Sequence, residues 1–369
     1  MKKLKKIRYY KNRKKVKYKE KCKEKYNKSK SPLIIKLTLI IILIIIIFIY
    51  RVILFQNFIK KIIIGVDVST RYGKGGPSTL TKNIYEVLPY ETKFCKFIPI
   101  EGIYPDISQK TNYFYKPYPL MDEKTYDKWK NINKANSLLL GPCFVPISWF
   151  KFPSNVFWNE RRFREISSSI KGLIVHSDRV RNHLVTKSNT NDLFNKYILL
   201  RPCTHILSND IKPFKEREYD IIFYGKYMDS DRSKQGNQLV SLLKGANKKI
   251  EQLNYRNYNI KDEYNLANNS KFIIYFSFYD TGAIALKEIQ NYGVITFTLQ
   301  KDFVISDESC YYIPELELDD ITPAFNKIIK LMDEISNKNP DSIKLAKINQ
   351  DINKCQRALD DLCDGVIRQ

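Results

Sequence analysis

The clearest pattern along the chain is an apolar run, a polar loop, a helical repeat and a second apolar run, between Lys271 and Phe297. Residues 272–276 are all aromatic or β-branched, which is typical of a buried parallel strand. Residues 283–291 place apolar side chains at helical spacing, and Gly293 follows where a C-terminal cap is expected. The pattern therefore predicts a strand–loop–helix–strand unit. Its loop lies at the carboxyl end of a parallel sheet, where open α/β sheets bind ligands.

Short apolar runs alternate with helical segments on both sides of this unit. Strands are predicted at 62–67, 94–100, 137–140, 172–175, 197–200, 219–224, 248–253 and 311–314. Helices are predicted at 79–88, 126–133, 238–243, 262–268, 321–338 and 341–363, whereas 101–120 reads as loop. This alternation is typical of α/β proteins with parallel sheets. We expect one domain over 62–212 and a second, which includes the terminal helices, over 213–369.

A different pattern precedes the first domain. Leu33 to Phe55 is almost entirely apolar, with Lys36 and Arg51 near its ends, and about 20 apolar residues span a bilayer. No small-residue cleavage site follows, so 32–55 is predicted to be an uncleaved transmembrane anchor rather than a secretory signal.

The charge of the chain is concentrated before that anchor. Residues 1–31 hold 16 Lys or Arg against two Glu, a net +14 of the formal +24. Positive residues stay on the cytoplasmic side, which predicts a single-pass type II membrane protein with the residues after Arg51 in a lumen or outside the cell. We expect the membrane to be that of the endoplasmic reticulum or Golgi, with the catalytic part in the lumen. The tail can set topology and contact anionic lipid. Nucleic-acid binding is the alternative, but no aromatic-interleaved basic repeat or zinc spacing supports it, so no nucleic-acid partner is expected.

Six cysteines follow the apolar segment: Cys95, Cys143, Cys203, Cys310, Cys355 and Cys363. An even number permits disulfides without specifying the pairs. Cys355 and Cys363 lie eight residues apart on a predicted helix, roughly 12 Å along its axis, which is too far for a bond between them. No CxxC or Cys/His cluster is present, so no metal site is expected.

Two carboxylates mark the helix entry of the central unit. Asp280 lies in the loop and Glu288 follows about two turns further on, with Gly282 between them. Such a pair can hold sugar or ribose hydroxyls while free backbone N–H groups face a phosphate. Near the start of the first domain, Gly75 and Gly76 lie between a strand and a helix, an arrangement that suits either a phosphate- or sugar-facing loop or a structural turn; it is neither GxGxxG nor a P-loop.

The stretch from Asp280 to Glu288, followed five residues later by Gly293, resembles the acidic-x7-Glu motif of retaining glycosyltransferases of the GT-B architecture, group 1 or family 4. The first acidic position in that class is usually Glu, and Asp280 is one methylene shorter. The loop from Gly75 to Thr79 is similar to the class's Gly-Gly loop, and 172–184 matches the strand and helix that close its first domain. Within that stretch Ser177 is better explained as an N-cap than as a nucleophile.

The resemblance implies two Rossmann-like domains that face a cleft, behind one N-terminal transmembrane helix. It also implies that Glu288 holds the donor's ribose, that Asp280 holds its sugar, and that Lys226 with a second basic residue neutralises the donor diphosphate. The catalytic residues would be Asp280, Glu288 and Lys226. The donor-binding residues would be Lys226, Arg232, Lys234, Asp280, Thr281, Gly282 and Glu288, with Gly75, Gly76 and His176 lining the cleft.

The expected activity is transfer of a sugar from a nucleotide-sugar to a hydroxyl of a glycan, protein or lipid, with retention of configuration and without a metal or cofactor. Two alternatives remain open at this point. Asp229-Ser230-Asp231 could hold a divalent cation in a GT-A glycosyltransferase. Alternatively, the chain is an inactive membrane-anchored binder, which Asp280 in place of Glu and the long basic loop after Lys226 favour.

Overall fold

The computed structural model describes residues 17–21, 36–37, 39–51, 61–72, 76–101, 111–117, 138–141, 170–182, 196–204, 210–226, 230–254, 260–278, 280, 282–304 and 307–369. Gly75, Cys143, Asp229, Thr281 and the helix predicted at 126–133 lie outside these residues. The chain divides into two compact units, 1–60 and 61–369.

The first unit contains helix at 17–21, 36–37 and 39–51, and the apolar side chains of the last segment are exposed. Within the part of the chain that the structure describes, no helix combines the length and apolar character needed to cross a membrane. The anchor expected over 32–55 stays a prediction.

The second unit begins with a seven-stranded sheet in the order β2-β3-β1-β4-β5-β6-β7. Its strands are β1 (Ile62–Asp67), β2 (Tyr90–Glu91), β3 (Cys95–Ile100), β4 (Tyr113–Lys116), β5 (Leu138–Leu140), β6 (Gly172–Val175) and β7 (Tyr197–Leu199). All neighbours are parallel except the short β2 at the edge. Because β1 lies between β3 and β4, the chain reverses its direction of travel across the sheet at β1.

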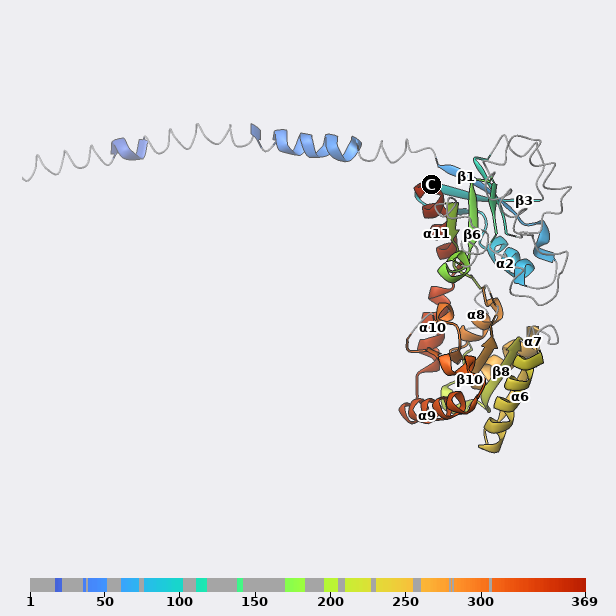
Figure 1. Ribbon diagram of the computed structural model, residues 1–369. Coiled ribbons are helices and arrows are strands. Elements are labelled where there is room, and N and C mark those ends of the chain that lie inside the picture. Colours follow the sequence, from blue (N-terminus) through green and yellow to red (C-terminus); the bar gives the residue numbers. More distant parts are fainter. Residues whose placement is uncertain are drawn as a thin grey trace, which may run out of the picture. The chain divides into compact units, whose positions relative to one another are not determined.

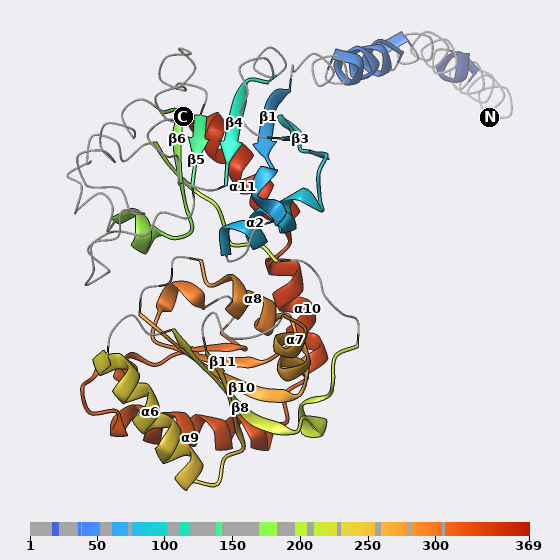
Figure 2. The same cartoon turned by 90° about the vertical axis from the view of Figure 1, so that its right-hand side faces the viewer.

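Two helices far apart in sequence cover one face of this sheet. Leu80 and Ile84 of α2 (Gly76–Tyr85) and Leu359 and Leu362 of α11 (Cys355–Arg368) belong to one apolar cluster with the strands. Disulfides tie α11 to the same body, one to β3 and one to the segment after β7; the pairs are Cys95–Cys363 and Cys203–Cys355. From Cys355 onward, the chain therefore packs with the first sheet (Figures 1 and 2).

The second sheet has five parallel strands in the order β12-β11-β10-β8-β9. They are β8 (Tyr219–Lys226), β9 (Ile250–Asn254), β10 (Ser270–Ser277), β11 (Ile295–Thr298) and β12 (Cys310–Tyr312). Along β10, Phe272, Ile274 and Phe276 face one apolar cluster, whereas Ile273 and Tyr275 face another. A strand buried on both faces reads as a continuous apolar run, which is why the sequence shows no alternation here.

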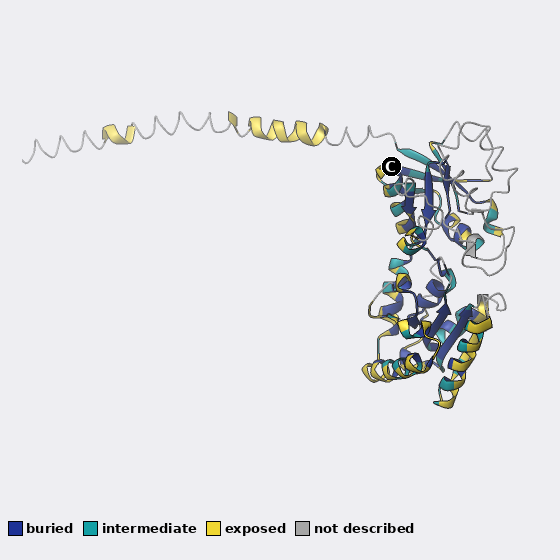
Figure 3. Ribbon diagram, viewed as in Figure 1, coloured by how far each residue is buried: buried dark blue, intermediate teal, exposed yellow. Residues whose placement is uncertain are grey.

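Helices cover both faces of the second sheet. On one side α6 (Ser230–Gly245) and α9 (Thr322–Lys338) pack against it, and on the other side α7 (Ile260–Asn268) and α8 (Ile284–Gln290) do so, with α10 (Ser342–Ile352) beside α8. The strands are buried, whereas α6 and α9 expose their outer faces (Figure 3). Short 3₁₀ turns complete the unit: η1 (Ser69–Tyr72), η6 (Phe214–Glu216), η7 (Lys301–Phe303) and η8 (Pro314–Glu317).

The predicted strand–loop–helix–strand unit is confirmed as β10, α8 and β11, and Gly293 adopts the positive φ of 70° expected after the helix. Three predictions were wrong. The stretch predicted as loop at 101–120 contains β4; α6 begins at Ser230, eight residues before its predicted start, so that Arg232 and Lys234 lie on a helix; and the helix predicted at 341–363 is two helices, α10 and α11.

Candidate functional site

The site lies where the strand order of the second sheet reverses. β8 and β10 are neighbours, although β9 comes between them in sequence, and ligands of open α/β sheets bind at the carboxyl ends of such strands. Lys226 ends β8 directly opposite Ser277, which ends β10. Asp280 follows three residues later, so a basic and an acidic side chain meet at this point.

Asp280 is buried and holds several donors at once. Its Oδ2 accepts a hydrogen bond from the Tyr275 hydroxyl and lies 3.0 Å from the Lys226 ammonium. Its Oδ1 accepts from the backbone N–H of Ala283 at 3.2 Å and, more weakly, of Gly282 at 3.4 Å. The Ala283 N–H, at the helix entry where a phosphate is expected, therefore faces this carboxylate instead.

The protonation of Asp280 follows from these partners. Burial acts to raise its pKa, but the Lys226 charge and the hydrogen bonds from Tyr275, Lys226 and Ala283 outweigh burial and hold the pKa well below its ordinary value. Asp280 is thus a carboxylate at neutral pH, and it can accept further hydrogen bonds but cannot supply a proton.

His176, at the end of β6 in the first domain, lies directly against the Asp280 loop. Its Nδ1 donates to the carbonyl of Leu200 at 2.9 Å, which leaves Nε2 as an acceptor. Burial lowers its pKa to about 4, so the ring is neutral at pH 7. A Cβ added at Gly282 would lie 2.4 Å from the imidazole Cδ2, so only glycine permits this approach.

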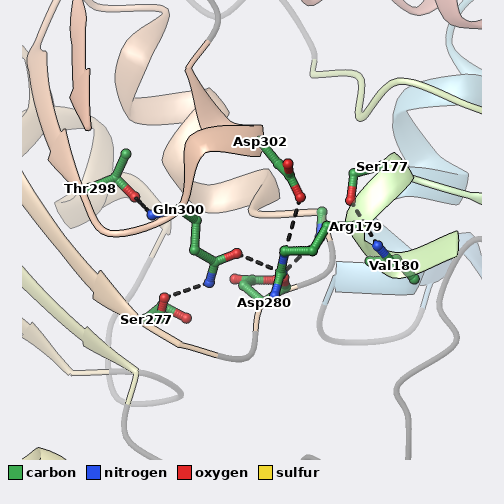
Figure 4. A network of polar contacts seen from close by, with 9 residues as sticks. Ser177, Arg179, Val180, Ser277, Asp280, Thr298, Gln300 and Asp302 are labelled. Atoms are coloured by element: carbon green, nitrogen blue, oxygen red, sulfur yellow. Dashed lines mark hydrogen bonds and ion pairs between the residues drawn. The ribbon is translucent and has the colours of Figure 1, made fainter. Parts of the chain in front are cut away.

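Arg179 makes a second connection from the first domain to the same loop (Figure 4). It follows β6 in a short helical segment, 178–182, for which Ser177 acts as the N-cap by accepting from the N–H of Val180 at 3.3 Å. One guanidinium nitrogen donates to the main-chain carbonyl of Asp280 at 2.7 Å and to Gln300 Oε1 at 2.6 Å. Nε lies 3.0 Å from Asp302.

Glu288 has a different set of partners from Asp280. It is buried on α8, accepts a hydrogen bond from Tyr264 of α7 and lies within electrostatic range of Lys82 of α2. Burial raises its pKa to about 7. α8 lies on the side of the second domain nearest the first in Figures 1 and 2, and it contacts α2.

A second buried carboxyl group, Glu263 of α7, lies within electrostatic range of Glu288. Burial first, and then the charge of Glu288, raises the pKa of Glu263 to about 9. Its Oε1 is buried without a hydrogen-bond partner. At neutral pH Glu263 is therefore protonated, whereas Glu288, with the lower pKa of the two, is the one that ionises first.

The two basic residues proposed to assist Lys226 differ in their surroundings. Arg232 stacks over the Phe278 ring, 4.0 Å from its centroid, and donates to Gln235 at 2.7 Å. Phe278 lies two residues before Asp280, so Arg232 is held next to the loop. Lys234 is exposed and pairs with Asp231 at 3.8 Å.

The first sheet carries a matching pair at its own reversal point. Asp67 ends β1, Lys116 ends β4, and their side chains form an ion pair of 3.1 Å. Asp67 also accepts hydrogen bonds from the N–H and hydroxyl of Ser69. Gly76, expected to be in a cleft loop, is the first residue of α2.

Sequence reasoning missed three residues of the site: Arg179, Tyr275 and Glu263. Tyr275 is an ordinary aromatic in an apolar run and Glu263 an ordinary helical glutamate, so neither carries a local signal. Arg179 falls inside the stretch that resembles the end of a first GT-B domain, but only tertiary contacts identify its partners. Among the described residues, no group of three or more His, Cys, Asp or Glu side chains is arranged to hold a metal ion.

No protein-family model and no curated protein matches the sequence. Solved structures do match the fold. Sucrose-phosphate synthase from Thermosynechococcus elongatus aligns with a TM-score of 0.51 at 11% identity, covering 82% of this chain and 97% of that one. The lipopolysaccharide outer core galactosyltransferase WaaB aligns with a TM-score of 0.51 at 8% identity, covering 84% and 99%. The predicted GT-B fold is confirmed, so the GT-A architecture of the alternative does not apply; the metal role considered for Asp229 and Asp231 stays a prediction, since Asp229 lies outside the described residues.

Proposed function

We propose that the protein is a glycosyltransferase that moves a sugar from a nucleotide-sugar to a hydroxyl group on a glycan, protein or lipid. The observation that carries the proposal is the Lys226–Asp280 pair at the carboxyl ends of β8 and β10, on a GT-B fold. Asp280 is ionised and can accept hydrogen bonds from sugar hydroxyls. The Lys226 ammonium can neutralise a diphosphate, and this interaction strengthens as negative charge develops on the leaving oxygen.

Two further roles belong to this proposal. Glu288 holds the vicinal hydroxyls of the donor ribose, since its carboxylate is on α8 near the first domain and shares a hydrogen bond with Tyr264. Arg232 is the better second partner for the diphosphate, because stacking on Phe278 fixes it beside the loop, whereas Lys234 is exposed. Transfer proceeds with retention of configuration and without a required metal ion, as the acidic-x7-Glu resemblance implies.

A panel of nucleotide-sugars tests the activity. The full chain, purified in detergent, is incubated with each donor, and released nucleotide is measured with and without simple hydroxyl acceptors. Glu288→Ala is expected to lower turnover by at least about 10²-fold, since it removes a contact to the donor. Glu334→Ala, on the exposed face of α9, is the control. Unchanged turnover in Glu288→Ala, with an unchanged melting temperature, would refute the assignment of Glu288.

The second candidate is a membrane-anchored protein that binds a glycan or nucleotide without chemistry. It is favoured by the partners that the Asp280 carboxylate already has, a tyrosine hydroxyl, an ammonium and backbone N–H groups, because these compete with a sugar hydroxyl for the same oxygens. The panel separates the two candidates, because a pure binder releases no nucleotide from any donor that it binds.

The proposal also includes the location of the enzyme. We place 1–31 in the cytoplasm, an anchor at 32–55 and the second unit in the lumen of the endoplasmic reticulum or Golgi. The two disulfides of the second unit support an oxidising compartment, because such bonds are rare in the cytosol. Protease protection of the second unit in sealed microsomes tests this orientation, and digestion without detergent would contradict it.

A further inference from the structure

We propose that Arg179, a residue of the first domain, is a positioning residue. It holds the Asp280 loop of the second domain in the conformation that catalysis requires. The inference rests on the proposed function for its catalytic consequence, but its structural part stands alone. It identifies a residue outside the acidic-x7-Glu motif on which the position of that motif depends.

The main evidence is that Arg179 binds the backbone of Asp280 rather than its side chain. The guanidinium donates to the Asp280 carbonyl at 2.7 Å, while the Asp280 carboxylate points to Lys226 and Tyr275. The backbone of this residue is thus held from the first domain and its side chain from the second sheet. A carbonyl fixed in this way restricts the peptide that leads to Gly282 and Ala283, whose N–H groups face the same carboxylate.

The remaining contacts of Arg179 tie the loop to the strand beside it. Gln300, which accepts from Arg179 at 2.6 Å, is buried just after β11 and donates to the carbonyl of Ser277 at the end of β10. Its own N–H donates to Thr298. Figure 4 shows Arg179 reaching from the segment of Ser177 and Val180 toward Asp302, Gln300 and Asp280. The three acceptors belong to two different loops, and the planar guanidinium fork spans them.

A lysine cannot replace this fork. Its single ammonium keeps the charge that pairs with Asp302 but cannot donate in several fixed directions. Arg181 lies two residues further along the same segment and pairs with Asp178. Arg179→Lys and Arg181→Lys are therefore the same substitution in the same segment, the first at the residue that binds the Asp280 carbonyl and the second at a residue that pairs with Asp178.

The first experiment needs no substrate. Hydrogen exchange of the full chain is followed in peptides that contain the Gly282 and Ala283 amides. Arg179→Lys is expected to accelerate their exchange about tenfold, the loss expected for charge-assisted hydrogen bonds, whereas Arg181→Lys exchanges as the wild type does. Equal protection in Arg179→Lys and wild type overturns the proposal.

Kinetic measurements then show whether Arg179 positions the Asp280 loop for catalysis or only holds the two domains together. Arg179→Lys should lower kcat about tenfold or more while nucleotide affinity stays within threefold, because Glu288 and Lys226 are untouched. The charge-exchanged variant Arg179→Asp with Asp302→Arg can restore the ion pair but cannot restore the donor to the Asp280 carbonyl. It should recover the melting temperature and not kcat; recovery of kcat to the wild-type value overturns the positioning role. A wild type inactive on every donor would refute the proposed function, and the exchange experiment would still decide the structural claim.

Discussion

Each of the two sheets has an acid–lysine pair at the point where its strand order reverses, and the two pairs differ in what surrounds them. In the first domain Asp67 is paired with Lys116 of the adjacent strand and with Ser69 of its own loop. In the second domain Asp280 is paired with Lys226 and Tyr275, and its backbone is held by Arg179 of the other domain. The same topology thus yields a pair with partners in its own domain in one sheet, and a pair whose backbone is held from the other domain in the second sheet.

The two domains also differ in how they are held together. Disulfides join the first sheet and its following segment to α11, although the bonded residues are 268 and 152 positions apart in sequence. The second domain packs helices against both faces of its sheet, and its buried Cys310 takes part in neither disulfide. The first domain is thus held by disulfides in addition to its packed core, whereas the second is held by packing.

The largest expected effect distinguishes the two acid–lysine pairs. Lys226→Met should lower turnover by roughly 10²- to 10³-fold, since it removes the cation proposed to stabilise the departing diphosphate. Lys116→Met, the same substitution at the first pair, should lower it less than tenfold. Turnover and nucleotide affinity of both full-length variants provide the measurement. Equal losses would mean that the difference between the pairs has no functional meaning.

The central unit of the site was predictable because its signals are local. The apolar run of β10, the helical spacing of α8 and the glycine after it all lie within 27 residues, and Asp280 and Glu288 are marked by their spacing. Arg179 and Tyr275 were not predictable, because their importance comes from contacts across the fold. Arg179 reaches Asp280 across 101 residues of sequence.

The wrong predictions of secondary structure have the same physical origin. The sequence predicts a loop where β4 lies, because Tyr113 to Lys116 belongs to a stretch rich in tyrosine and proline, and only pairing with β1 and β5 makes it a strand. The start of α6 is polar and shows no apolar spacing. The break between α10 and α11 contains neither glycine nor proline. Instead Asn353 is held by tertiary bonds, donating from its side chain to Asn291 and accepting at its carbonyl from Thr204.

The second-largest expected effect concerns the disulfide between Cys203 and Cys355. Replacing Cys203 and Cys355 together by serine should lower the free energy of unfolding by about 2 to 5 kcal/mol, because the bond closes a long loop. Hydrogen exchange should show the loss in peptides of β1 and β3, and much less in those of β8 and β10. Cys310→Ser, a buried cysteine outside any disulfide, measures the cost of the substitution itself. Uniform loss of protection in both sheets would show that the domains unfold as one unit.

The smallest effect tests the buried carboxyl pair of the second domain. The pKa of Glu288 is raised to about 7 and that of Glu263 to about 9, in both cases mainly by burial. When the pKa of a carboxyl group is higher in the folded state than in the unfolded state, its protonation stabilises the fold. This contribution is complete below about pH 4.5 and is lost as the pH rises through the folded-state pKa. The second domain should therefore become less stable between pH 6 and pH 9.

Glu263→Gln isolates this contribution, because the amide keeps the shape of the side chain and cannot ionise. Between pH 6 and pH 9 the wild type should lose about 1 to 3 kcal/mol more unfolding free energy than the variant does. Urea unfolding followed at both pH values measures the difference, and Glu334→Gln, at an exposed site on α9, should behave as the wild type does. If wild type and Glu263→Gln lose the same amount, burial does not hold Glu263 in its protonated form. Glu288 would then lie beside a second buried negative charge. Its proposed contact with ribose hydroxyls would need a cation nearby, and Lys82 of α2 is within electrostatic range of Glu288.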